Sequence, residues 1–167
     1  TAAPTVAAGG ALTIAHGNVW FANKVAPTDP QRVVDALRHA DPDVIAISEY
    51  SHDIATALAN TTLSRDYPHH VVDPDPRGLG SAIFSRRPLT ALTPPRTSPR
   101  TTAVLIDGIT VLGVHTPSPV ENLDEWNAAL DEWRQRVPGT EQPTVAIGDY
   151  NADLFHPALR RTLDGGW

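Results

Sequence analysis

Polar side chains stand at the ends of four otherwise apolar runs of the sequence. They are Asn18, Glu49, His115 and the pair Asp149 and Asn151. The end of a buried strand can hold a side chain firmly while its polar group lies in a cleft. Carboxylates are ligands for hard cations such as Mg²⁺, and a histidine beside a cation and a phosphate can donate a proton or a hydrogen bond. These residues are therefore candidates for metal-assisted chemistry.

Each of these residues also has a simpler explanation when it is taken alone. Glu49 could be a solvated residue that opens the following helix, where a negative charge is mildly favoured. A single histidine at a strand end, such as His115, is more often structural than catalytic. Asn18 by itself indicates almost nothing. A shared functional site therefore requires that the fold bring these positions together.

The segment Gly148-Asp-Tyr-Asn151 is the most specific of the four. In an extended chain, residues i and i+2 point to the same side, so Asp149 and Asn151 could face one ligand. Gly148 would let another backbone approach closely. The alternative is an Asx turn that closes the strand, with no ligand involved.

The basic residues give weaker signals. Arg77 with Gly78 and Gly80 could line an anion site, and Ser81 follows directly, but a short Gly-x-Gly motif is not specific. Arg86 and Arg87 precede a proline and are predicted to be solvated. Three other histidines lack metal-ligand spacing and are predicted to lie on the surface: His69, His70 and His156.

The elements that must position the candidate residues alternate along the chain. Strands are predicted over residues 12–20, 43–49, 67–72, 79–85, 89–92, 101–106, 109–115 and 144–148. The nearly all-apolar run before Glu49 is typical of a strand buried on both faces. Asp107-Gly108 between two of these runs is a strong hairpin signal, so antiparallel pairing is expected. Together with helices, this pattern predicts an α/β protein with mixed sheets.

Four helices are predicted between or after these strands. A capping box at Thr28 and Gln31 begins a helix that ends before Asp41-Pro42, and a second helix covers residues 51–60 with Ile54 and Leu58 inward. A second capping box, Ser118 with Glu121, precedes the third, and the last covers residues 157–164. The third is amphipathic, with its apolar side chains three and four residues apart: Leu123, Trp126, Leu130, Trp133 and Val137.

Composition excludes several classes of protein. The chain has 167 residues, of which 41% are hydrophobic and 19% charged, as expected for one folded domain. No apolar run approaches the roughly 18 residues of a membrane span. The absence of cysteine excludes disulfides and a cysteine nucleophile, and the net charge of −6 gives no strongly basic surface for nucleic acid. Residues 1–10 are predicted to be a flexible linker.

The order of these motifs resembles the endonuclease/exonuclease/phosphatase superfamily of DNase I-like, metal-dependent phosphoesterases. The resemblance covers residues 11–164, and it implies that residues 11–167 are a catalytic domain of this type that is incomplete at its C-terminal end. It is carried by Gly148-Asp-Tyr-Asn151, by Pro42-Asp-Val with the following Glu49, and by three further blocks in family order: Ile14 to Val19, Gly78 to Leu89, and Val111 to Pro119.

The resemblance implies a four-layer α/β sandwich and assigns roles within it. Asn18 and Glu49 match metal-binding positions, and the metal would be Mg²⁺ or Mn²⁺. His115 matches a histidine that contacts the scissile phosphate. Asp149 and Asn151 match the pair that orients phosphate and nucleophile, while Arg77 and Ser81 are candidate substrate-binding residues. The implied reaction is attack of water on a phosphate ester.

The sequence departs from the family pattern in three ways. His16-Gly17 precedes Asn18 where an aromatic residue is usual, and Ser48 precedes Glu49 where glutamine is usual. The family also ends with strands that carry an Asp-His couple, and no Asp-His step follows Asn151 here. We therefore expect a continuation of the protein, or a second chain, to supply that couple.

The acidic charge favours a small or lipid-linked phosphate or pyrophosphate as substrate over nucleic acid. Two alternatives remain: a Mg²⁺-dependent nuclease acting on DNA or RNA, and a catalytically incomplete binding module on the same fold. The compact pattern most resembles bacterial extracytoplasmic members of the superfamily. An extracytoplasmic location, with a membrane anchor only in a removed upstream segment, is the corresponding expectation.

Overall fold

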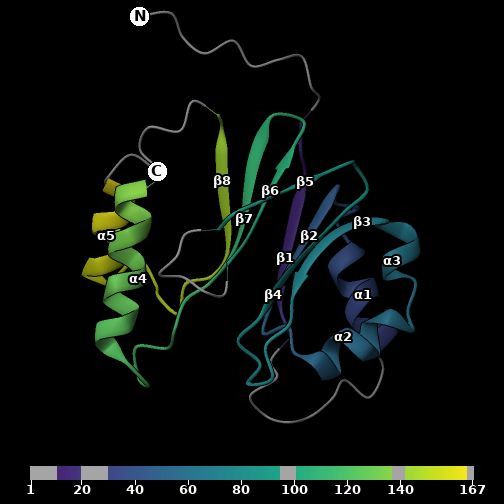
Figure 1. Cartoon of the computed structure of the whole chain (residues 1–167). Helices are drawn as coiled ribbons and strands as arrows, with labels where there is room; N and C mark the ends of the chain where they lie inside the picture. The colour runs from purple at the N-terminus through teal and green to yellow at the C-terminus, as the bar shows by residue number, and fades with distance from the viewer. Residues whose placement is uncertain (1–10, 20–29, 95–100, 137–141, 165–167) are drawn as a thin grey trace, which may run out of the picture.

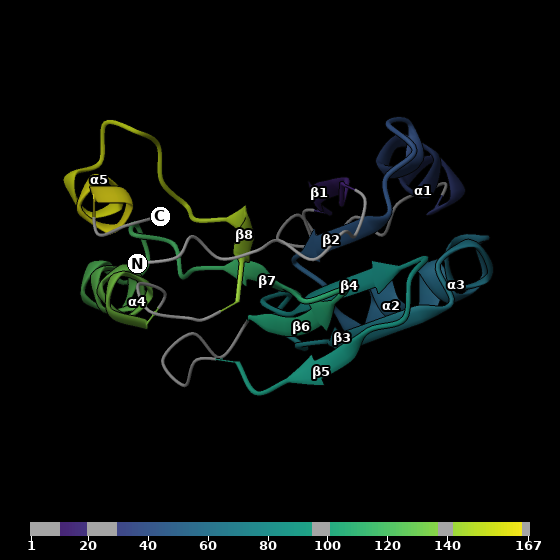
Figure 2. The ribbon, with the colours of Figure 1, turned by 90° about the horizontal axis from the view of Figure 1, so that it is seen from above.

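Two four-stranded sheets face each other in the computed structural model of the chain, and helices cover both outer faces (Figure 1 and Figure 2). This is the predicted four-layer α/β sandwich with mixed sheets. The structure describes residues 11–19, 30–94, 101–136 and 142–164. Among these residues, no helix has both the length and the apolar character to cross a membrane.

The first sheet has the strand order β1-β2-β4-β3, with β1 and β2 parallel and the other pairs antiparallel. Its strands are β1 (Ile14–Asn18), β2 (Val44–Ser48), β3 (His69–Asp73) and β4 (Ser81–Ser85). Three helices cover its outer face: α1 (Pro30–Arg38), α2 (His52–Ala59) and α3 (Leu63–Asp66).

The second sheet has the order β5-β6-β7-β8, and its last pair is parallel. Its strands are β5 (Thr90–Leu92), β6 (Thr102–Ile106), β7 (Ile109–His115) and β8 (Thr144–Asp149). Two helices pack on its outer side: α4 (Leu123–Arg136) and α5 (Pro157–Asp164). Each sheet thus contains one parallel pair, β1 with β2 and β7 with β8.

Strand β2 shows why a nearly all-apolar run folds into the middle of this sandwich. Ile45 and Ile47 pack with the helices of the first sheet, whereas Val44 and Ala46 pack against the second sheet. Successive side chains of a strand point to opposite faces, so a strand buried on both faces needs apolar residues throughout. All five residues of β2 are buried.

The predicted helix signals are confirmed in part. Ser51 caps α2 by accepting a hydrogen bond from the Ile54 amide, and Ile54 and Leu58 are buried as expected. The capping box before α4 is wrong in its position. Asn122 accepts from the Glu125 amide and donates to the Glu125 carboxylate, so the capping residue is Asn122, four residues after Ser118, and α4 begins at Leu123.

The side chains of α4 follow its predicted apolar stripe except at the start. Trp126, Leu130 and Trp133 are buried, but Leu123 is 56% exposed because it lies in the first turn, ahead of the part that packs on the sheet. The predictions for residues 1–10, Thr28, the loop over 95–100 and Val137 fall outside the described residues.

The hairpin between β6 and β7 is confirmed. Asp107 and Gly108 have φ values of 50° and 80°, the left-handed pair that a two-residue turn of this kind requires. The solvated state predicted for Arg86 and Arg87 is wrong. Arg86 pairs with Asp41, and Arg87 lies between the carboxylates of Asp43 and Asp107.

Candidate metal centre

The two parallel strand pairs end at the same edge of the sandwich. In β1 and β2 the pairing ends with Asn18 opposite Ser48, and in β7 and β8 it ends with His115 opposite Asp149. The two pairs also contact each other across the sheets. Parallel strands end on the same side, so the topology brings residues more than 130 positions apart into one cluster.

Asn18 joins the two acidic residues of this cluster. Its side-chain amide donates to Glu49 Oε1 at 3.0 Å and to Asp149 Oδ2 at 2.8 Å. One carboxylate comes from the first sheet and the other from the second. The predicted convergence of Asn18, Glu49 and Asp149 is therefore seen in the structure.

Glu49 reaches the cluster because of its backbone conformation. Strand alternation would turn its side chain toward the helix layer, since Ile47 faces the helices. Instead Glu49 has a backbone φ of 59°, in the left-handed region that residues other than glycine seldom adopt. The next residue fixes this turn, because the Tyr50 amide donates to the Gly80 carbonyl at 3.0 Å and the Tyr50 carbonyl accepts from the Asp75 amide.

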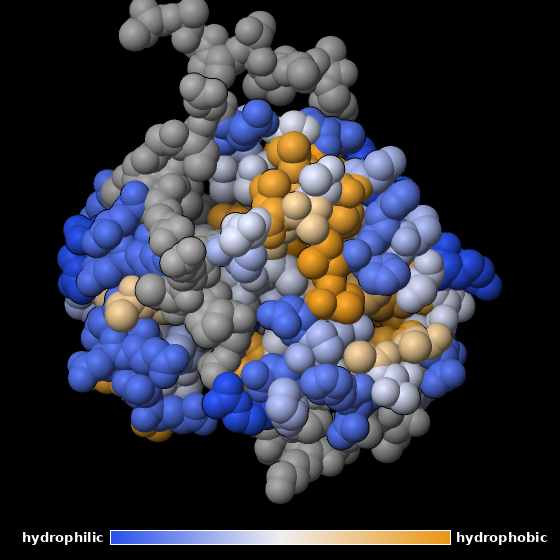
Figure 3. Space-filling view, in the orientation of Figure 1, coloured by the Kyte–Doolittle hydropathy of each residue, from blue (hydrophilic) through white to orange (hydrophobic). Residues whose placement is uncertain are grey.

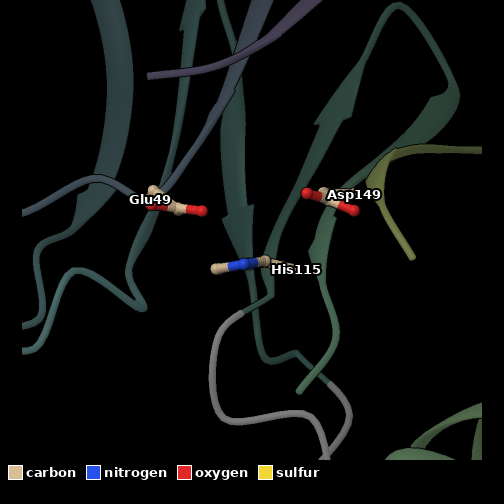
Figure 4. A group of neighbouring side chains, drawn as sticks. All are labelled: Glu49, His115 and Asp149. Atoms are coloured by element: carbon tan, nitrogen blue, oxygen red, sulfur yellow. The ribbon is translucent and has the colours of Figure 1, made fainter. Parts of the chain in front are cut away.

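His115 is buried, and its ring is oriented by the β3–β4 loop. Nδ1 lies 3.2 Å from the Leu79 carbonyl, which can only accept, so Nδ1 carries a proton. Nε2 is then left for the cluster, where it can bind a cation or, when the ring is protonated, donate to an anion. Figure 4 shows Glu49, His115 and Asp149 converging from three different strand ends.

Asn151 is placed differently from the expectation. It has φ 47°, and its amide donates to Asp149 Oδ1 at 2.8 Å, which is the Asx turn that was the alternative. Its side-chain amide donates to the Thr116 carbonyl at 2.9 Å. The same-side arrangement expected for an extended chain is thus not adopted, because the chain turns at Asn151. This residue holds the ends of β7 and β8 together.

The two predicted substrate-binding residues do not join the cluster. Ser81 is fully buried and its hydroxyl donates to Thr102 Oγ1 between the sheets, so the structure contradicts its role in substrate binding. Arg77 lies in an exposed loop and pairs with Asp75. Its role as a substrate ligand stays a prediction.

The donor set fits a divalent cation. One ligand atom from each of Glu49, His115 and Asp149 lies within 4.8 Å of the others. Opposite ligands of an ion with bonds of about 2.1 Å lie about 4.2 Å apart, so only a small approach is needed. Two carboxylates favour Mg²⁺ or Mn²⁺, and the imidazole is more usual with Mn²⁺ than with Mg²⁺.

Two further residues, His16 and Ser48, lie beside this cluster, although the sequence indicated them only as departures from the family pattern. His16 lies two residues before Asn18 on the same face of β1, and its Nε2 is 2.9 Å from the hydroxyl of Ser48. Burial lowers the pKa of His16, Asp149 opposes that shift, and His115 adds to it. The alternation of β1 was the signal that could have placed His16 near the cluster.

Solved structures share this arrangement of sheets. A humanized Danio rerio (D. rerio) TDP2 has a TM-score of 0.65 at 18% identity, over 93% of this chain and 66% of that one. Beta toxin from Staphylococcus aureus has 0.64 at 15% identity, over 93% and 71%. An endonuclease/exonuclease/phosphatase from Beutenbergia cavernae has 0.61 at 19% identity, over 88% and 50%. The chain thus has the DNase I-like fold and spans about one half to seven tenths of these structures.

The family follows from the sequence itself. The sequence model of the Endonuclease/Exonuclease/phosphatase family matches residues 15–167, nearly the whole chain. The chain belongs to this family, whose members are metal-dependent phosphoesterases and nucleases. No curated protein sequence matches the chain.

Proposed function

We propose that this protein hydrolyses phosphate esters with the help of a divalent cation bound at the strand-end cluster. The observation that carries the proposal is the pair of carboxylates, Glu49 and Asp149, that a single amide of Asn18 brings together from two different sheets. Two carboxylates that both bind this one amide repel each other, and this repulsion opposes folding. A cation bound between them would offset the repulsion.

Each residue of the cluster has a distinct role in the proposed reaction. Glu49 and Asp149 would hold the cation, with Asn18 orienting both carboxylates. The cation, when bound, supplies positive charge to the phosphoryl oxygens as water attacks. His115 presents Nε2 to the same space while its Nδ1 is held by Leu79, so it can donate to a phosphate oxygen as its ring gains a proton. Asn151 keeps the His115 and Asp149 ends in register through Thr116.

We propose a small or lipid-linked phosphate or pyrophosphate as the substrate, and a location outside the cytoplasm. The net charge of −6 supports the substrate class, because proteins that bind nucleic-acid backbones rely on basic surfaces. Nuclease activity is the second candidate, and the structural similarity to TDP2, which has been solved in complex with a single-strand DNA product, favours it.

The test compares the native chain with Asp149→Asn in the presence of Mn²⁺ or Mg²⁺. We expect release of phosphate from short-chain lipid pyrophosphates that depends on both the metal and Asp149. Nicking of supercoiled plasmid that is abolished by Asp149→Asn would instead support the nuclease. If neither activity responds to the substitution, the protein is a binding module on this fold.

A further inference from the structure

A short chain of polar groups lies between the two sheets, directly below the candidate metal centre. It consists of the His16 ring on β1, the Ser48 hydroxyl on β2 and the Val114 carbonyl on β7. Ser48 is 1% exposed and its neighbours on this face of β2 are Val44 and Ala46, which belong to the apolar core between the sheets. Two polar side chains in this place require an explanation beyond packing.

The hydrogen bonds of this chain have a definite direction. The Ser48 hydroxyl has one proton and donates it to the Val114 carbonyl at 3.2 Å. It must therefore accept from His16, whose Nε2 is 2.9 Å away. The direction runs from His16 to Ser48 to Val114, and it fixes the Nε2–H tautomer of His16.

Each member of this hydrogen-bond chain is one or two residues away in sequence from a residue of the candidate metal centre. His16 is two residues before Asn18, Ser48 is one before Glu49, and Val114 is one before His115. A fourth strand end is tied to the same carbonyl, because a Cβ placed on Gly148 would lie 1.9 Å from Val114 O. The backbone before Asp149 therefore packs directly against the carbonyl that Ser48 binds.

We infer that the His16–Ser48–Val114 hydrogen-bond chain is a positioning element that sets the spacing of the strand ends carrying Glu49 and His115. The Ser48–Val114 hydrogen bond joins the two sheets, and the His16–Ser48 hydrogen bond holds the serine hydroxyl within the first sheet. Apolar packing is non-directional, whereas a hydrogen bond between the sheets fixes their relative position. The two sequence departures, His16 and Ser48, are then one feature: each is the hydrogen-bond partner of the other. The element acts through the metal centre, and so its effect on activity rests on the proposed function.

The first test needs neither metal nor substrate. Nitrogen-15 imidazole spectra of the native chain at pH 8 should show His16 as the Nε2–H tautomer and His115 as the Nδ1–H tautomer. Ser48→Ala should shift both sets of signals, because it removes the acceptor of His16 and releases β7. Ser85→Ala is the matched control, since Ser85 is equally buried on β4 at the far end of the sheet, and should change neither.

Two results of this test would overturn the inference. One is an Nδ1–H tautomer of His16 in the native chain, and the other is a His115 signal that is the same in Ser48→Ala as in the native chain. Both judgements hold whether or not the protein binds a metal.

The second test measures the affinity of the protein for Mn²⁺. His16→Leu should weaken Mn²⁺ binding about tenfold, the scale found for groups that orient metal ligands. His16→Gln, which keeps an N–H donor at a similar reach, should restore most of it. An equal loss in both variants contradicts the positioning role. Absence of Mn²⁺ binding by the native chain overturns the proposed function instead, and leaves the spectra to decide the inference.

Discussion

The sandwich has a polar cluster at each end, and the two clusters are built on opposite principles. At one end the Arg87 guanidinium lies between the carboxylates of Asp43 and Asp107, and so links the first sheet to the β6–β7 hairpin. At the other end two carboxylates, Glu49 and Asp149, both accept hydrogen bonds from the neutral amide of Asn18. The first cluster holds an arginine between its carboxylates, whereas the second holds an uncharged amide between them.

The backbone differs between the two ends in the same sense. At the Arg87 end, the left-handed residues Asp107 and Gly108 form a tight turn that the sequence favours. At the other end, Glu49 and Asn151 hold left-handed conformations that re-aim functional side chains. Left-handed backbone at a non-glycine residue costs of order 1–3 kcal/mol and persists only where the surrounding structure holds it in place. The left-handed residues thus form a tight turn at one end and orient the candidate metal ligands at the other.

The largest expected effect comes from Asp149→Asn at the site end. It should reduce metal-dependent hydrolysis roughly 10³-fold, because it removes a charge that holds the cation. The melting temperature without metal should stay the same or rise, since repulsion with Glu49 is relieved. Asp107→Asn at the other end is the matched control and should behave in the opposite way, with full activity and lower stability.

Thr116→Val should stabilise the protein by about 1 kcal/mol. The Thr116 hydroxyl is buried and has no hydrogen-bond partner among the described residues, although its backbone amide and carbonyl bind Asp149 and Asn151. Valine has the same shape without the unpaired oxygen. Urea unfolding measures the effect, and a loss of stability would show that the hydroxyl is satisfied in solution.

Arg87→Met should lower the melting temperature by a few degrees and leave activity unchanged. The substitution keeps the aliphatic part of the side chain but leaves the carboxylates of Asp43 and Asp107 without their shared cation. Calorimetry and the phosphatase assay check the two halves of this prediction. A large loss of activity would mean that the two ends are coupled.

The smallest effect is a pH dependence of the Arg87 end. The backbone amide of Thr13, its hydroxyl and Arg87 hold the pKa of Asp43 below its ordinary value of 3.8. A lowered carboxyl pKa contributes stability that is present above 3.8 and is lost as the pH falls through the lower, folded-state value. The free energy of unfolding, measured from pH 5 to pH 2, should therefore fall less steeply with decreasing pH for Asp43→Asn than for the native chain.

The sequence predicted most of the fold because its signals are local. The apolar run of β2, the Asp107-Gly108 turn and α5 over residues 157–164 are each defined by neighbouring residues. The start of α4 was missed because two capping sequences lie four residues apart, and their local patterns do not show which one the helix uses; the structure uses Asn122, directly before the turn that buries Trp126.

The sequence predicted which types of residue form the site, but not how they are arranged. That Asn18, Glu49, His115 and Asp149 would meet follows from strand order, which the family resemblance supplied. The left-handed turn at Glu49 depends on Tyr50 pairing with Gly80, a contact between distant segments. Ser81 was misplaced because its distance in sequence from the cluster does not reveal that it faces Thr102 between the sheets.

The central claim is that the strand-end cluster binds a divalent cation, and a Mn²⁺ titration followed by electron paramagnetic resonance tests it most directly. The native chain and Arg87→Met should bind Mn²⁺ with the same affinity, and Glu49→Gln and Asp149→Asn should each bind it at least about tenfold more weakly. Equal Mn²⁺ affinity in all four proteins would contradict the account, because the carboxylates would then have no part in holding the ion.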